Sequence, residues 1–515
     1  MNEVRAVGTR VEDLKGFRGS IRYVGSVGST QGEWLGIEWD DASRGKHNGT
    51  HNGIHYFEAA PLGGSFVRVS KIKSGKGIRE AVEDRYGSKH ADEEFRPEDI
   101  LEIQRGMKAS LFEIVGMDKV RQAQKDYGKL NVISLRNMCV QFIDGDLKDF
   151  MPNVMSLDLG ENLLHSWDEV FYIIKDLSHL KYLCVSENRL LTPRKSLPFI
   201  PPLKHLVLGR MNYNWNEIYS IIQHIPSLEN LQIHGNTISS IDHSSCEIAA
   251  TLPNLRELDL NLNPLVKWKH VSKFSKCQHL ESLMLNDCKL TEIDEIDEGF
   301  PLLNKIELNC NDFKNWKTLG HLNSLPSLKE VRLKGNELRG VLPSFQPMNR
   351  RLSPRQTTIA MLGRITILNG TEIDRQERIG AEIDYWKMFG LDYIEAKKKD
   401  TSFSNLPPRY VEIVAMHGEP DESELRGKDS TMDDMFLNLT LKRKEEIRNK
   451  KVPLTMTIKA LKILSKKLFK APNLKDMELS YTTEKSKDVS IPLDDDMREI
   501  SYFGVINGDT IRVHW

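Results

Sequence analysis

Residues 180–190, LKYLCVSENRL, carry the pattern that decides the fold of this chain: apolar residues at fixed positions, followed by an asparagine and a final leucine. The pattern occurs nine times between residues 130 and 338, at intervals of 23 to 27 residues. Its first apolar positions are Leu130, Val154, Leu180, Leu203, Leu228, Leu255, Leu280, Leu303 and Leu328. Each copy supplies a short strand and a return segment that cannot bury its apolar face alone, so we expect the copies to stack into a solenoid. A solenoid offers a broad surface to other macromolecules, which favours a binding function.

This spacing is typical of leucine-rich repeats and predicts an α/β solenoid over residues 109–396. We expect one asparagine per repeat to satisfy turn backbone inside the stack through its side-chain amide. These asparagines are Asn162, Asn188, Asn236, Asn263, Asn311 and Asn336. After residue 361, Leu362, Ile365 and Ile367 return to the repeat spacing and lead into an amphipathic helix through about Ala396. This helix is expected to cap the last apolar layer.

The composition is that of a nearly neutral chain of 515 residues. Lys and Arg (72) almost balance Asp and Glu (73), so no global field draws the chain to nucleic acid or to an anionic membrane. The N-terminus has no apolar signal segment, and no run approaches the roughly 20 residues of a membrane span. The six cysteines form no CxxC pair, which argues against zinc and favours reduced thiols in the cytoplasm.

Composition shifts divide the chain into five parts. Residues 1–73 are rich in glycine and alternate like strands in SIRYVG and WLGIEW. Residues 74–108 are expected to form a charged connector, in part helical, which would span tens of ångströms if flexible. Residues 397–430 are rich in Lys, Ser, Pro and acids and are expected to be a linker. Residues 431–515 contain strand candidates FLNLTLK and VPLTMT, a helix IKALKILSKKLF, a strand DMELSY, a polar loop and a closing strand. This order resembles a ubiquitin-like β-grasp of the α+β class.

The first part carries glycines and aromatic residues at a specific spacing. The matching positions are Gly16, Gly19, Gly25, Trp34, Gly36, Trp39, the segment GKHNG at 45–49, Tyr56, Phe57, Gly64, Phe66 and Val67. Together they resemble the CAP-Gly domain, which implies a small β-barrel. That family binds acidic peptides ending in Glu-Glu-Tyr or Glu-Glu-Phe, as on α-tubulin.

The resemblance also suggests which residues of this chain would hold such a peptide. Lys46 and the amides of the loop, with His47 and Asn48, suit the carboxylates, while Trp34 and Phe66 suit the terminal ring. His47 and Asn48 stand where the family loop usually has Asn and Asp. Trp39 and Tyr56 are expected to belong to the core, and most of the glycines are expected to meet the backbone requirements of turns.

The order of CAP-Gly domain, leucine-rich repeats and ubiquitin-like domain resembles the tubulin-folding cofactor E family along essentially the whole chain. The resemblance implies a cytoplasmic, cytoskeleton-associated chaperone. It would bind α-tubulin and, with cofactors B, C and D and β-tubulin, assemble or dissociate the αβ heterodimer. An alternative is an adaptor that carries a solenoid-bound client to the proteasome through the ubiquitin-like domain.

Charged residues between the inward leucines are candidates for a partner-binding face of the solenoid. The acidic ones are Asp158, Glu187, Glu257, Asp259, Glu307 and Glu330, mixed with Lys305 and Arg332. Ordinary solvated charge is the alternative explanation for each of them. The sequence has no Walker A spacing, no HExxH and no GxSxG, so we expect neither catalysis nor a cofactor.

Overall fold

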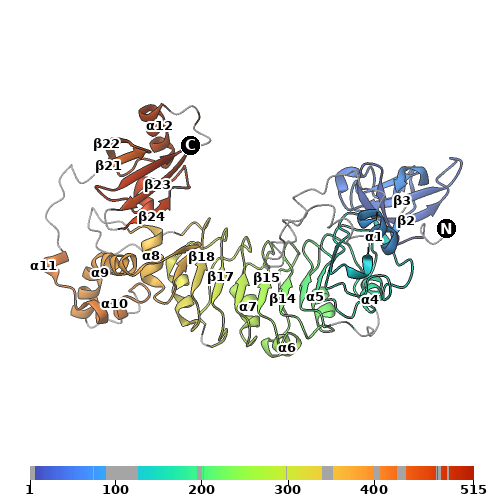
Figure 1. Ribbon diagram of the computed structural model, residues 1–515, viewed down its shortest axis with the longest axis horizontal. Helices are drawn as coiled ribbons and strands as arrows, with labels where there is room; N and C mark the ends of the chain where they lie inside the picture. The colour runs from blue at the N-terminus through green and yellow to red at the C-terminus, as the bar shows by residue number, and fades with distance from the viewer. Residues whose placement is uncertain are drawn as a thin grey trace. The chain divides into compact units, whose positions relative to one another are not determined.

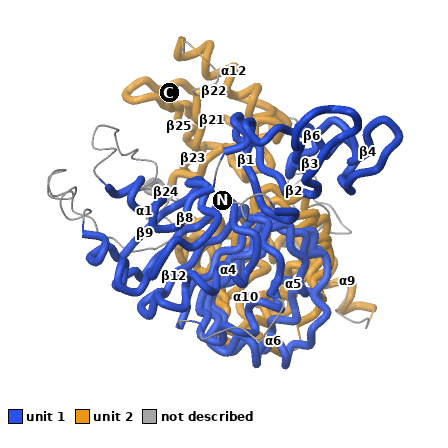
Figure 2. Tube along the Cα trace, turned by 90° about the vertical axis from the view of Figure 1, so that its right-hand side faces the viewer, with its two compact units in different colours: residues 1–265, 270–284 blue, residues 266–269, 285–515 orange. Residues whose placement is uncertain are grey.

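The computed structural model describes residues 6–73, 75–87, 126–193, 200, 202–296, 298–338, 352–399, 406–425, 436–470, 473, 477–483 and 486–515. By its internal contacts the chain divides into two compact units (Figure 2). The first comprises residues 1–265 and 270–284, and the second residues 266–269 and 285–515. Figure 1 labels many of the helices and strands of both units.

The first unit begins with an antiparallel sheet of order β6-β3-β2-β1-β7. Its strands are β1 (Arg10–Asp13), β2 (Arg18–Gly25), β3 (Trp34–Trp39), β6 (Gly64–Val67) and β7 (Ile72–Lys73), and a small hairpin pairs β4 (Thr50–His51) with β5 (Ile54–His55). The expected strands SIRYVG and WLGIEW are therefore confirmed. The core of the sheet is formed by Val11, Ile21, Leu35, Ile37, Trp39 and Val67. The strand order is open in the described residues, so a closed barrel stays a prediction.

The repeats of the first unit each contribute one three-residue strand to a parallel sheet. These strands are β9 (Val132–Ser134), β11 (Ser156–Asp158), β12 (Tyr182–Cys184), β13 (His205–Val207), β14 (Asn230–Gln232), β15 (Glu257–Asp259) and β16 (Ser282–Met284). The central leucines stand opposite one another, Leu157 beside Leu183 and Leu183 beside Leu206, and all three are buried. Return segments include the helices α4 (Trp167–Ile174), α5 (Trp215–Ile222), α6 (Ser245–Thr251) and α7 (Trp268–Val271).

The asparagine ladder is confirmed, and it fixes the spacing between repeats. Asn162 is buried, and its Oδ1 accepts hydrogen bonds from the backbone N–H groups of Met138 and Val140. Its Nδ2 donates to the carbonyl oxygens of Leu135 and Leu159. One side chain thus satisfies turn backbone in two successive repeats, which an apolar residue could not do. The other five predicted asparagines are also buried.

Residues 75–87 of the expected connector are packed on the solenoid rather than free, and the partly helical structure expected for this segment is confirmed there. There β8 (Lys76–Gly77) pairs in parallel with β10 (Val140–Phe142), and α1 (Ile78–Tyr86) buries Ile78, Ala81 and Val82. The Tyr86 hydroxyl accepts a hydrogen bond of 2.9 Å from the N–H of Ser134. The segment therefore covers the first apolar layer of the solenoid. The solenoid domain thus includes residues before the expected boundary at residue 109. Residues 88–108, and the helical start expected near residues 111–117, lie outside the described residues.

The second unit continues the repeats and closes them with helices. Its strands are β17 (Lys305–Glu307), β18 (Glu330–Arg332), β19 (Ile367–Leu368) and β20 (Thr371–Glu372), with α8 (Pro354–Met361) and the long α9 (Arg375–Lys398). Val331 pairs in parallel with Leu368, which confirms the return to repeat spacing after residue 361. The cap helix expected through about Ala396 is also confirmed, as α9.

The linker expected over residues 397–430 is wrong for residues 406–425. This segment forms α10 (Tyr410–His417) and α11 (Glu422–Leu425), which pack against α9. Tyr410 is buried and donates a 2.7 Å hydrogen bond from its hydroxyl to the carbonyl oxygen of Trp386. The apolar spacing of Tyr410, Ile413 and Val414 is helical, and it outweighs the polar composition around it. The solenoid cap therefore extends beyond α9.

The C-terminal part of the second unit is a mixed sheet of order β22-β21-β25-β23-β24. Its elements are β21 (Phe436–Arg443), β22 (Glu446–Pro453), α12 (Ile458–Phe469), β23 (Glu478–Thr483), β24 (Ser486–Pro492) and β25 (Thr510–His514). The first and last strands are parallel and adjacent, as a β-grasp requires. The second strand was expected at VPLTMT, but it begins at Glu446, because a tight hairpin follows β21 directly. Strand β24 lies where a polar loop was expected.

Candidate functional site

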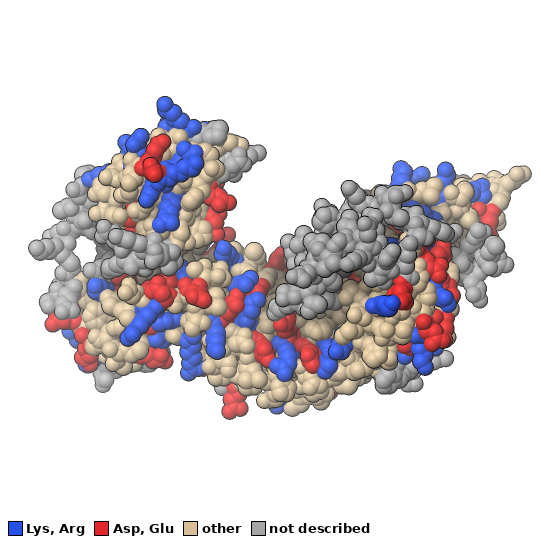
Figure 3. All heavy atoms as spheres, viewed as in Figure 1, with Lys and Arg blue, Asp and Glu red and all other residues tan. Residues whose placement is uncertain are grey.

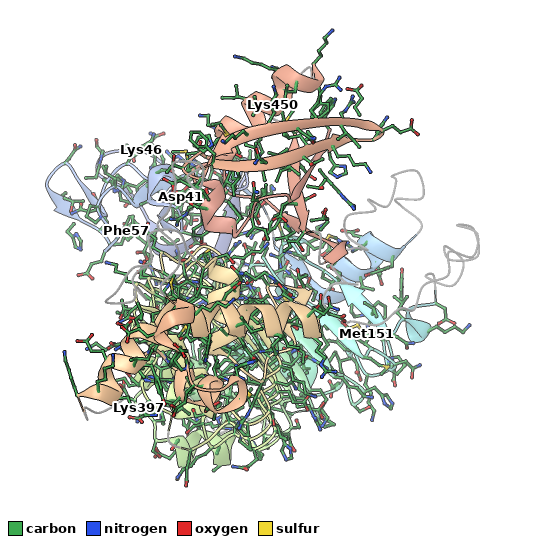
Figure 4. All side chains as sticks on the ribbon, turned by 90° about the vertical axis from the view of Figure 1, so that its left-hand side faces the viewer. Asp41, Lys46, Phe57, Met151, Lys397 and Lys450 are labelled. Carbon is green, nitrogen blue, oxygen red and sulfur yellow. The ribbon has the colours of Figure 1, made fainter. Side chains whose placement is uncertain are left out.

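The GKHNG loop of the first domain is held against strand β6. Lys46 and His47 both donate backbone hydrogen bonds to the carbonyl oxygen of Gly64, at 2.7 and 3.1 Å, and the Gly64 N–H donates back to His47 at 2.7 Å. Gly49 has a φ of +96°, and a Cβ there would lie 1.5 Å from the Phe57 carbonyl oxygen. Only glycine fits that position. Lys46 is consequently presented on a fixed loop with its side chain exposed (Figure 4).

Phe66 is the centre of an aromatic cluster beside this loop. Its half-buried ring makes contacts with the rings of Tyr23, His47, His51, Tyr56 and Phe57, at centroid distances of 5.0 to 6.2 Å. Most of these contacts are edge-to-face, the geometry that aromatic quadrupoles favour. The cluster gives a terminal aromatic ring a surface of the same kind to pack on.

The sheet register explains how the cluster is assembled. Tyr23 on β2 and Phe66 on β6 both stand opposite Gly36 of β3, so the three residues form one row on one face of the sheet. A Cβ at Gly36 would lie 2.5 Å from the Phe57 ring. The missing side chain therefore leaves the space that the rings occupy.

Two residues expected in the site stand differently in the structure. The Arg68 guanidinium lies 3.8 Å from the centroid of the Trp34 ring, and Trp34 is not among the described ring contacts of Phe66. Arg68 is held there by hydrogen bonds to the carbonyl oxygens of Glu33 and Gln31. Tyr56, expected in the core, is only half-buried, and its hydroxyl accepts a hydrogen bond from the Gly28 N–H. Tyr23, His51 and Arg68 were missed by sequence reasoning, although strand alternation on β2 and β6 could have indicated Tyr23.

His47 links the aromatic cluster to the charge of the loop. Its Nδ1 accepts a 3.0 Å hydrogen bond from the Gly49 N–H. Burial, together with the nearby His51 and Lys46, lowers the pKa of His47 below its usual range. The ring is thus kept neutral near pH 7, and an acidic ligand would oppose that effect. Asn48, the remaining predicted loop residue, is exposed, and its Oδ1 accepts from the Thr50 N–H.

The first domain is fixed to the solenoid by polar contacts. Arg189 pairs with the Asp40 carboxylate at 3.3 Å and donates to the Asp40 carbonyl oxygen at 3.2 Å. Arg18 pairs with Glu161 at 3.7 Å, and Gln141 donates to the Arg10 carbonyl oxygen at 2.8 Å. Asp40 directly precedes the turn that leads into the GKHNG loop. The structure therefore shows the first domain in contact with the solenoid, rather than free on a flexible tether.

The predicted solenoid face carries mixed charge. In the first unit, Asp158 accepts from the Gly160 N–H, Glu187 pairs with Arg136 at 2.5 Å, Glu257 accepts from Asn230 at 2.5 Å, and Asp259 lies 3.4 Å from His234. In the second unit, Glu307 pairs with Lys305 at 2.7 Å and Glu330 with Arg332 at 2.9 Å. All six carboxylates therefore have polar partners, so a free acidic stripe is not present. Their role in binding a partner stays a prediction.

The described residues also bear on other kinds of site. No group of three or more His, Cys, Asp or Glu side chains among them is placed to hold a metal ion. In the same part of the chain, no helix is both long and apolar enough to cross a membrane.

Comparison with known proteins gives three findings. The family model of the CAP-Gly domain matches residues 7–72, which confirms the resemblance of the first domain. Tubulin-specific chaperone E of Homo sapiens is 33% identical over 99% of this chain and 98% of that protein. Tubulin-folding cofactor E of Arabidopsis thaliana is 30% identical over the same shares. The solution structure of the C-terminal ubiquitin-like domain of mouse tubulin-specific chaperone E is 29% identical, with a TM-score of 0.15, over 17% of this chain and 94% of that one.

Proposed function

This chain belongs to the tubulin-specific chaperone E family, and we propose that it acts as a tubulin-folding chaperone that binds α-tubulin at two places. The first domain holds the acidic C-terminal tail, and the solenoid holds the folded body. The observation that carries the proposal is full-length similarity to proteins named for tubulin folding, combined with a lysine-bearing loop beside an aromatic cluster. The family name also supports a non-enzymatic role, with the other tubulin cofactors and β-tubulin as further partners in the cytoplasm, at the cytoskeleton.

The chemistry of the first domain fits a peptide that ends in Glu-Glu-Tyr. Lys46 is exposed on a pinned loop and can donate a charge-assisted hydrogen bond to a carboxylate. Phe66 and Tyr56, 5.3 Å apart and half-buried, offer ring faces and edges to a terminal aromatic side chain. Arg68, stacked on Trp34, adds a second cation to the same domain. Trp34 thus orients a cation in this arrangement, rather than covering the terminal ring by itself.

Two linked sites would raise the affinity for tubulin without any new contact, because the second binding step becomes intramolecular. The contacts of Arg189 and Arg18 fix the first domain on the solenoid, so the gain would come from a preset orientation rather than from a long tether. The mixed charges along the repeat strands would then select a complementary surface on the tubulin body.

Titration calorimetry with the full chain tests the tail site. We expect a Glu-Glu-Tyr peptide to bind and the same peptide without its last residue to bind much more weakly. Lys46→Ala should weaken binding by roughly 1–3 kcal/mol, the range for losing a charge-assisted hydrogen bond. Lys71→Ala, at another exposed lysine of the same domain, is the matched control. Equal affinity for the two peptides would refute the tail site.

The partner of the C-terminal domain is a separate proposal. A chain ending at residue 425 should still bind the tail peptide. Recovery of tubulin and tubulin cofactors by the full chain, and their reduced recovery by this shorter chain, would support the chaperone. Recovery of proteasome subunits alone would instead support the adaptor alternative.

A further inference from the structure

The β21–β22 hairpin and helix α12 concentrate positive charge within an almost neutral protein. Residues 436–470 contain eleven Lys and Arg residues and two Asp and Glu residues, a net charge of +9 (11 − 2), whereas the whole chain has −1. The basic residues are Lys442, Arg443, Lys444, Arg448, Lys450, Lys451, Lys459, Lys462, Lys466, Lys467 and Lys470. Figure 3 shows Lys and Arg gathered over this domain on the face in view. Two carboxylates cannot neutralise eleven cations, so the segment has a positive electrostatic potential although the whole chain is almost neutral.

Many of the basic side chains are exposed along one edge of the sheet. Strand β22 is an edge strand, and residues 446–451 are all exposed. Leu439 stands opposite Lys450, and Leu441 opposite Arg448. Residues directly opposite share a sheet face, so Arg448 and Lys450 point to the side on which α12 packs over Leu439 and Leu441.

Helix α12 extends this basic side. Lys459, Ile463 and Lys467 are exposed and recur every four residues, so they form one stripe turned away from the core. We use the term basic surface for the hairpin residues 442–451 together with the exposed stripe of α12. Figure 4 labels Lys450 on the hairpin.

The acidic part of the same domain faces the end of the solenoid. Asp494 lies 3.4 Å from Lys334 of the last repeat, and Asp496 pairs with Lys462 at 2.7 Å. A cavity of about 640 Å³ lies between residues 333–338, helix α8 and residues 491–497, and no residue of the hairpin lines it. Asp494 thus faces the solenoid, Asp496 partners Lys462 of α12, and the exposed hairpin and the α12 stripe have no part in these contacts.

Protection of an edge strand does not explain this arrangement. Lysines on an edge strand discourage unwanted strand pairing, which accounts for the charges of β22. The lysines of α12 protect no strand edge, yet they continue the same surface. Exposed like charges this dense repel one another, and that cost is relieved by an anionic partner.

We propose that the basic surface docks an acidic polypeptide segment, at a site separate from the CAP-Gly loop. Six of its eight cations are lysines, whose ammonium groups suit flexible carboxylates rather than the bidentate contacts of arginine. Nucleic-acid surfaces add aromatic rings for base stacking. Here the rings of Trp515 and Phe436 are already covered by Arg443 and Lys451, at 3.6 and 5.4 Å. The open edge of β22 can also pair with an extended segment. This site needs no terminal aromatic residue and goes beyond the proposed function.

Fluorescence anisotropy with the full chain tests the proposal. The probe is a labelled peptide of twelve glutamates with an amidated C-terminus, in a Lys46→Ala background that removes the loop cation. We expect binding that weakens steeply with salt, and a loss of about tenfold or more in the triple variant Lys444→Glu, Arg448→Glu and Lys450→Glu, at exposed residues of the hairpin. The matched control is Lys289→Glu, Lys314→Glu and Lys317→Glu, which changes the net charge equally at exposed residues of the repeats.

A second variant guards against misfolding of the hairpin. Lys459→Glu with Lys467→Glu changes only the exposed stripe of α12 and should weaken the same peptide several-fold, while circular dichroism verifies that both variants fold. If the control variant with three charge reversals on the repeats lost as much peptide affinity as the hairpin variant, the proposal would be overturned, because net charge alone would then explain binding. Tighter binding of a labelled single-stranded RNA or of phosphatidylserine vesicles than of the peptide would also overturn it, in favour of those partners.

Discussion

Two glycines of the first domain allow a sharp test of the loop geometry. Both Gly49 and Gly53 have left-handed backbone, with φ of +96° and +77°. A Cβ at Gly53 meets nothing within 4 Å, whereas a Cβ at Gly49 would lie 1.5 Å from the carbonyl oxygen of Phe57. Gly53→Ala should therefore cost only the left-handed strain, about 1–2 kcal/mol. Gly49→Ala adds a collision with backbone to that strain.

The size of the Gly49 effect follows from the contacts that must break. An ordinary carbon–oxygen contact is about 3.3 Å, so the two segments must separate by about 1.8 Å. That movement disrupts the 3.1 Å bond from the Tyr56 N–H to the Gly49 carbonyl oxygen and the 3.0 Å bond from the Gly49 N–H to His47. Each bond contributes about 1 kcal/mol. With the strain included, the local cost of Gly49→Ala is about 3–4 kcal/mol.

Hydrogen exchange of the amides of residues 45–57 measures this local free energy. Calorimetry with the Glu-Glu-Tyr peptide measures the consequence for binding. We expect Gly49→Ala to lose both amide protection and peptide binding, because Lys46 and His47 depend on the same loop. Gly53→Ala should retain peptide binding. Equal behaviour of the two variants would refute the argument that the loop geometry positions Lys46.

Further predictions concern pH, the contact between domains, and the solenoid. Because the pKa of free His47 lies below its usual range and bound carboxylates would raise it, peptide binding takes up a proton. The affinity should therefore rise as the pH falls from about 8 to 6, and His47→Gln should remove that slope in calorimetry. In a double-mutant cycle, Arg189→Ala and Asp40→Asn should show a coupling free energy of about 0.2–1 kcal/mol, the range for a partly exposed ion pair. Hydrogen exchange of the amides of residues 40–45 measures it, and purely additive effects of the two substitutions would contradict the contact. Charge reversal on the solenoid should weaken tubulin heterodimer binding but not tail-peptide binding, and unchanged heterodimer binding would reduce the solenoid to a spacer. The three reversed residues are Asp158, Glu187 and Asp259.

The repeats could be predicted from sequence because one local rule recurs nine times. The buried leucines and the asparagine ladder both depend on that rule, and Asn162 serves the turns of two repeats as expected. The elements that were missed depend on contacts between distant segments. Tyr410 is buried because it reaches Trp386 of another helix, and α1 is buried because Tyr86 reaches Ser134. Composition alone assigned both segments to polar connections.

In the candidate site, too, residues with a local sequence pattern could be predicted, whereas contacts between distant segments could not. The GKHNG loop and Phe66 were identifiable, because glycine and aromatic spacing is local to the strands that carry them. Arg68 stacks on Trp34 only because β6 is the neighbour of β3, and this pairing must be known before the contact can be seen. Five of the six solenoid carboxylates lie on repeat strands, whereas Glu187 lies in the turn after β12. The contacts of Glu187 with Arg136 and of Asp259 with His234 join neighbouring repeats, and the spacing of residues within one repeat cannot predict them.

The central claim is that this chain binds α-tubulin through both its first domain and its solenoid. Analytical ultracentrifugation of the purified chain with αβ-tubulin, without added nucleotide, tests it most directly. We expect a stoichiometric complex that contains α-tubulin, which weakens but persists when the tubulin tails are removed by limited proteolysis. Absence of any complex at micromolar concentrations, or a complex that disappears completely with the tails, would contradict two-site binding.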